Sequence, residues 1–164
     1  MHYRPDTPAE PPVGTGGIVG GVALGLVAGL AWELLSIQTD WRLGLSPPAW
    51  EIVVGWLGFS AFSAFVMIVF TLAAVAVYWT NSIARNPQSW DARQAVARAR
   101  QRAASFVLGA GGLAVIGGVV MWAAGRTGPE FEAYAGFARF TAIVGVVTVV
   151  CSVLYLKRDP DKPL

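Results

Sequence analysis

One carboxylate stands out in this sequence because it lies inside an apolar stretch. Glu33 belongs to the run Val13–Leu35, and no other Asp or Glu interrupts that run. A carboxylate within a bilayer has to be paired with a cation, protonated, or close to the interface. Its chemistry is therefore that of an ion-pair partner or that of a proton or cation site.

Two arginines are candidate partners for Glu33. Arg139 lies near the start of the fourth apolar run, and Arg126 follows the third. If the runs thread a membrane alternately, Glu33 and Arg139 come to a similar depth. We favour an intramembrane ion pair of Glu33 with one of these arginines, and a functional ion site at Glu33 is the alternative.

Other reactive residues are too few for the common catalytic and metal sites. The chain has one cysteine, Cys151, and one histidine, His2, so a cysteine cluster and bis-histidine haem ligation are excluded. Glu130 and Glu132 stand two apart in an expected loop, and no HExxH, Walker, GxSxG or CxxC motif occurs. We predict no catalytic residue, no metal and no cofactor, although a quinone or pigment between apolar walls stays open.

The elements that carry these residues are long apolar runs. The chain has 164 residues, of which 55% are hydrophobic and 13% charged, and its mean hydropathy is +0.55. A bilayer-spanning helix needs about 20 apolar residues. Four runs meet or approach this length, which predicts an all-α integral membrane protein with four transmembrane helices in two hairpins, at about 13–35, 52–79, 104–124 and 137–156.

The positions of the basic residues predict how these helices thread. Nine of the twelve Lys and Arg residues lie in segments 1–12, 80–103 and 157–164. By the positive-inside rule these segments are cytoplasmic, giving a disordered N-terminal tail, a basic connection and a C-terminal tail, all inside. The small-x-small sequence Gly29-Leu30-Ala31 could end a signal peptide, but the acids before the first run favour a retained helix.

The basic connection is a candidate contact with lipid or with an acidic partner. Four of its arginines are closely spaced but do not form one helical stripe. Such a charge run usually sets orientation and meets anionic head groups, and it does not point to nucleic acid. The arginines concerned are Arg93, Arg98, Arg100 and Arg102.

Small residues in helical register predict close helix contacts. The first run places glycine at every fourth position before Glu33, and the third run repeats the pattern. Inside a bilayer, small residues let backbones approach closely, and a row of this kind favours a right-handed crossing near −40°. The predicted interface residues are Gly17, Gly21, Gly25, Gly29, Ala110, Ala114 and Gly118.

Together these features predict a small non-enzymatic protein of the plasma membrane that acts through helix packing. Its partners would be the lipid bilayer and other transmembrane helices, either in a larger complex, as an accessory or assembly subunit, or in a self-associating scaffold. The alternative is a small oligomeric transporter, channel or pore former with Glu33 as its ion site. The Arg-over-Lys, Ala/Gly/Val-rich composition suggests a bacterial origin.

Overall fold

The structure consists of four long α-helices. The computed structural model describes residues 14–85, 90–125 and 129–157, and the side chains of 14–82, 93–125 and 134–157. The described part of the chain is all-helical, and each helix has a segment long and apolar enough to cross a membrane. The helices are α1 (Thr15–Arg42), α2 (Ala49–Arg85), α3 (Trp90–Ala124) and α4 (Pro129–Leu156).

The helices run beyond the apolar segments that the sequence analysis identified. Helical residues 36–42, 80–85 and 129–136 were expected to belong to connections. Hydropathy reports where a chain leaves the hydrocarbon, whereas a helix continues as long as its backbone hydrogen bonds remain satisfied. The expected disordered tail 1–12 lies outside the described residues.

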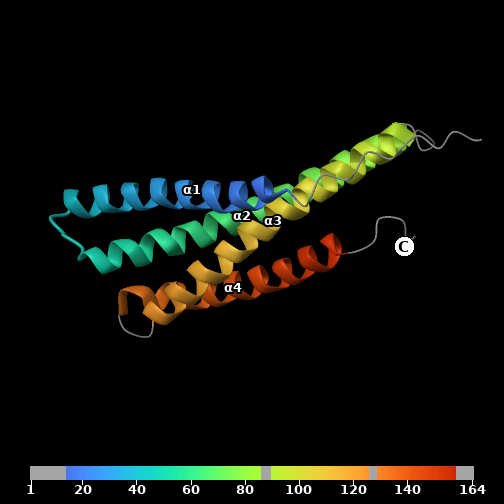
Figure 1. The fold of residues 1–164 in the computed structure, drawn as a ribbon. Coiled ribbons are helices and arrows are strands. Elements are labelled where there is room, and N and C mark those ends of the chain that lie inside the picture. The colour runs from blue at the N-terminus through green and yellow to red at the C-terminus, as the bar shows by residue number, and fades with distance from the viewer. Residues whose placement is uncertain (1–13, 86–89, 126–128, 158–164) are drawn as a thin grey trace, which may run out of the picture.

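Helix α3 is the centre of the arrangement. It packs against all three other helices, whereas α1 and α4 do not contact each other among the described residues. In Figure 1, α1 and α2 lie on one side of α3, and α4 follows its lower part on the other side. The bundle is therefore splayed, with α1 and α4 as outer helices.

Glycines explain why α3 can serve three neighbours at once. A Cβ built on Gly109 would collide with the backbone of Ile18 in α1, and one on Gly117 with the backbone of Leu57 in α2. A Cβ on Gly118 would lie 2.8 Å from the carbonyl oxygen of Ala138 in α4. Only glycine lets backbones approach this closely.

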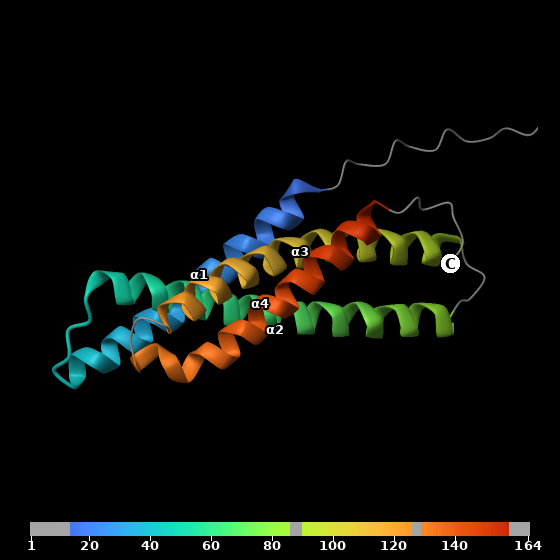
Figure 2. The ribbon, with the colours of Figure 1, turned by 90° about the horizontal axis from the view of Figure 1, so that it is seen from below.

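The two ends of the molecule differ. At one end, here called the pocket end, the connection Leu43–Pro48 joins α1 to α2, and Gly44 adopts a positive φ of 77° there. At the other, called the arginine end, α2 and α3 run side by side beyond α1 and α4 (Figures 1 and 2). Between the ends, α2 and α3 form a buried apolar core of Ala64, Ile68, Val107, Ala110, Leu113 and Ala114.

Candidate functional site

The glycine row of α1 begins against α3. A Cβ on Gly17 would lie 2.9 Å from the Cβ of Ser105, and one on Gly21 would lie 3.0 Å from the backbone nitrogen of Ala110. Both distances are below ordinary van der Waals contact. The first half of the row is therefore in backbone contact with α3.

The same row ends against α2. A Cβ on Gly25 would meet the Leu113 side chain of α3 and would lie 3.8 Å from the Cβ of Ala64 in α2. A Cβ on Gly29 would lie 2.6 Å from the Cα of Ser60. The row thus faces α3 at its start and α2 at its end. This is expected, because each step of four residues turns the side-chain direction by about 40° around the helix axis.

The residues of the second predicted set, on α3, contact different neighbouring helices. Ala110 faces Gly21 of α1, and Ala114 belongs to the buried core. A Cβ on Gly118 would lie 2.9 Å from the backbone nitrogen of Ala142 in α4. Both predicted sets meet helices of their own chain, and a contact with another chain stays a prediction.

Glu33 continues the α1 row and is buried. Only 6% of its surface is exposed, and its carboxylate lies against Gly55 of α2, where a Cβ would come within 2.8 Å of the Glu33 Cδ. The missing side chain at Gly55 makes the space that the carboxylate occupies. Within the described part of the chain, Glu33 has neither a hydrogen bond nor an ion pair.

The structure does not bring Arg139, the first expected partner, to Glu33. The guanidinium of Arg139 lies over the Trp122 ring, 5.4 Å from its centre, and its helix α4 does not contact α1. A cation over the face of tryptophan is stabilised by the ring quadrupole, which gives Arg139 an alternative to a carboxylate. Arg126, the second candidate, lies outside the described residues.

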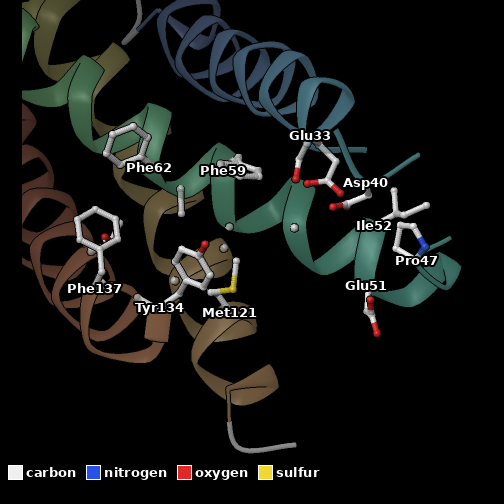
Figure 3. A pocket seen from close by; sticks show the side chains of 18 residues that line it. Glu33, Asp40, Pro47, Glu51, Ile52, Phe59, Phe62, Met121, Tyr134 and Phe137 are labelled. Carbon is white, nitrogen blue, oxygen red and sulfur yellow. The ribbon is translucent and has the colours of Figure 1, made fainter. Parts of the chain in front are cut away.

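Glu33 opens into a pocket at the pocket end of the molecule. The pocket has a volume of about 600 Å³ and draws its walls from all four helices and from Pro47. Figure 3 shows Glu33 and Asp40 beside each other on α1 at one end, with Phe62 and Phe137 at the other. Its size is in the range of sites that hold small organic ligands.

The remaining walls of the pocket are largely apolar. Phe59 stacks on Trp32 with ring centroids 6.4 Å apart. The ring centroids of Phe62 and Phe137 are 5.6 Å apart. The Thr141 hydroxyl donates a hydrogen bond to the Phe137 carbonyl oxygen at 2.9 Å, so this polar group is already satisfied. The aromatic end therefore offers a surface for an apolar group.

The four predicted contact arginines of α3 lie at the opposite end, the arginine end. Arg98 and Arg102 are exposed, and Arg93 is exposed as well. The guanidinium of Arg100 lies 5.2 Å from the centre of the Trp79 ring in α2, so this arginine joins α2 and α3 at the arginine end. A contact of these residues with lipid or with an acidic partner stays a prediction.

Four pocket residues named below were missed from the sequence, although spacing could have indicated three of them. Asp40 follows Glu33 by seven residues and therefore lies on the same helical face. Gly55 and Gly58 are three apart on α2, a spacing that opens one face of a helix. Nothing local marks Met121, because its place in the pocket depends on how α3 packs against α2.

Comparisons of the chain with protein-family models, with curated proteins and with solved structures found no match. The geometry of the chain itself is therefore what bears on its function.

Proposed function

We propose that this chain is a non-enzymatic integral membrane protein that acts through helix packing. In this proposal it is an accessory or assembly subunit of a larger membrane complex, or a scaffold that associates with its own copies. The observation that carries the proposal is a second pair of glycines on α1. A Cβ on Gly16 or Gly20 would meet nothing within 4 Å.

This second pair lies beside the row that the chain uses internally. On a helix, residues 16, 20, 23 and 27 share one face, and that face carries Gly16, Gly20, Ala23 and Val27. Glycine in a helix is less favourable than alanine by up to about 1 kcal/mol, and no contact within the described chain offsets that cost. A neighbouring transmembrane helix would offset it through close backbone contact.

We also propose the orientation and location that the charges favour. Arg93, Arg98 and Arg102 are exposed at the arginine end, and the positive-inside rule would place that end in the cytoplasm. Both chain termini would then be cytoplasmic, in a bacterial plasma membrane.

Affinity purification from native membranes in mild detergent tests the packing proposal. We expect a different membrane protein, or a second copy of the chain with another tag, to co-purify with the wild type. The double variant Gly16→Leu/Gly20→Leu should lose that partner because two side chains now fill the contact surface. The matched control is Val146→Leu/Val150→Leu, which enlarges two exposed α4 residues at the same spacing.

Two outcomes would overturn the proposal. One is that the wild type purifies as a monomer without partners. The other is that the α1 double variant keeps every partner of the wild type while a circular dichroism spectrum shows its helices intact.

A second candidate function is ion-coupled transport, favoured by one observation, the unpaired and buried Glu33 facing a pocket. The buried core of α2 and α3 lies between this pocket and the arginine end. A path across the membrane would therefore need either a rearrangement of these helices or an oligomer. Proton or cation flux into vesicles that survives Glu33→Gln unchanged would exclude Glu33 as the coupling site.

A further inference from the structure

We propose that the pocket binds an amphipathic organic cation. Its positive group would lie at Glu33, and its apolar body would lie between Phe59, Met121 and Phe137. The proposal does not depend on helix packing with a partner, and it holds whether or not the chain moves its ligand across the membrane.

The first step of the argument is that Glu33 needs a counter-charge. The side chain is buried to more than nine-tenths, and in the described residues it has no hydrogen-bond or ion-pair partner. Gly17, in α1, lies beside the carbonyl oxygen of Arg102, the residue after which the apolar part of α3 begins. Glu33 lies about 24 Å further along α1, so it is within the apolar thickness of a bilayer. A carboxylate at this depth is stabilised when a cation reaches it.

The second step is the sign of the surrounding charge. Asp40 and Glu51 line the same end of the pocket, and no described lining residue is Lys, Arg or His. In Figure 3 Asp40 lies next to Glu33, whereas the Glu51 carboxylate points away from the two. The charged side chains that line the pocket therefore attract a cation and repel an anion.

The third step separates an organic cation from a metal ion and from a zwitterionic lipid. Among the described residues no group of three or more His, Cys, Asp or Glu is placed to hold a metal ion. A zwitterionic lipid would bring a phosphate into the pocket, and the described lining offers no basic side chain to pair with it. An organic cation without an attached anion meets neither difficulty.

The fourth step is the apolar part of the ligand. From Gly55, against which the Glu33 carboxylate lies, to Phe62 the pocket follows α2 for about 10 Å. Its aromatic residues can contact both an apolar body and a delocalised positive charge. A volume of about 600 Å³ accommodates a ligand of several rings.

The fifth step is access. The outer helices α1 and α4 both contribute to the pocket but do not contact each other through the residues that the structure describes. Contacts between the aromatic rings of α2 and α4 involve Phe62, Phe65, Phe137 and Phe140, at the far end from Glu33. At the acidic end, no described contact between α1 and α4 closes the pocket. A lipophilic cation can therefore reach Glu33 between these two helices.

Equilibrium binding of tetraphenylphosphonium to the full chain in phosphatidylcholine nanodiscs tests the proposal. We expect saturable binding of one cation per chain above the background of empty discs. Tetraphenylborate has the same shape and the opposite charge, and it should not bind to the site. Glu33→Gln removes the charge with little change of shape and should weaken binding at least tenfold.

Two further variants keep the test decisive. Asp40→Asn removes the neighbouring lining charge and should weaken binding, but by less than threefold. If Glu33→Gln does not fold, Phe59→Ala keeps the carboxylate, removes one aromatic wall and should still weaken binding several-fold. Circular dichroism and the unfolding temperature in detergent establish that each variant is folded.

The proposal is overturned by any of three results. These are cation uptake no greater than that of empty discs, equal binding of tetraphenylborate, or unchanged affinity in folded Glu33→Gln. Loss of the co-purifying partners in the α1 double variant would not change the result of the binding measurement. The binding proposal and the packing proposal can therefore be refuted separately.

Discussion

At the scale of single residues, what a glycine faces decides its role. Gly20 and Gly21 are adjacent on α1, yet a Cβ on Gly20 would meet nothing within 4 Å, whereas one on Gly21 would collide with the backbone of Phe106. The obstacle at Gly21 is backbone, which cannot rotate away as a side chain can. The same substitution should therefore have opposite consequences at neighbouring positions.

We predict that Gly21→Ala destabilises the protein by about 1–3 kcal/mol, the usual cost of inserting a methyl group into a tightly packed contact. Gly20→Ala is the control and should be neutral or stabilise the helix by up to about 1 kcal/mol. Unfolding of both variants in detergent, followed by circular dichroism, measures the difference. Equal stability of the two variants would mean that Gly21 does not contact α3 as described.

At the scale of the helices, the small residues determine which surfaces pair. The α1 row contacts α3 near its start and α2 near its end, and α3 uses other glycines for α2 and α4. Burial of apolar surface cannot select among these pairings inside a bilayer, because lipid is as apolar as the helices. Steric fit between backbones therefore determines the register of α1.

A disulfide cross-link tests this register. In a Cys151→Ser background, Gly17→Cys/Ser105→Cys should oxidise readily, because the two Cβ positions are 2.9 Å apart and need to separate by only about 1 Å for a disulfide. The control pair Gly20→Cys/Ser105→Cys should stay reduced, since nothing lies within 4 Å of a Cβ at Gly20. Mobility in non-reducing gels reports the bond. Efficient cross-linking of the control pair, with none in the first, would contradict the described register.

At the scale of the whole molecule, the ends have different chemistry. Acidic side chains and the pocket lie at one end, and exposed arginines lie at the other, where α2 and α3 extend beyond the outer helices (Figure 2). At 37 residues α2 is about 55 Å long, more than the hydrocarbon thickness of about 30 Å. Part of this helix therefore lies outside the hydrocarbon, whichever way the chain is oriented.

Cysteine labelling in cells tests the proposed orientation. In a Cys151→Ser background, Leu45→Cys in the α1–α2 connection should react with a membrane-impermeant maleimide in intact cells. Arg98→Cys at the arginine end should react only after the membrane is permeabilised. Both positions are exposed, so a lack of reaction reflects the membrane rather than burial. The reverse pattern would show that the arginine end is outside.

The sequence by itself was sufficient to predict the four long apolar helices of the described chain and their approximate positions. This prediction succeeds because backbone N–H and C=O groups in a bilayer have to form hydrogen bonds within the protein. A single long apolar run meets this requirement as an α-helix. The helix ends were less accurate: residues 36–42 and 129–136 are helical although they were expected to be connections. A helix end depends on local backbone hydrogen bonds, which hydropathy does not report.

Only the tertiary structure decided the surroundings of Glu33. The sequence favoured a pair with Arg139 because the two residues were expected at a similar depth. In the structure α1 and α4 do not contact each other, Arg139 lies over Trp122, and Glu33 faces Gly55 and a pocket. Similar depth is a property of each helix alone, whereas contact requires two helices to be neighbours. Which helices are neighbours depends on the steric fit of surfaces drawn from all four segments of the chain.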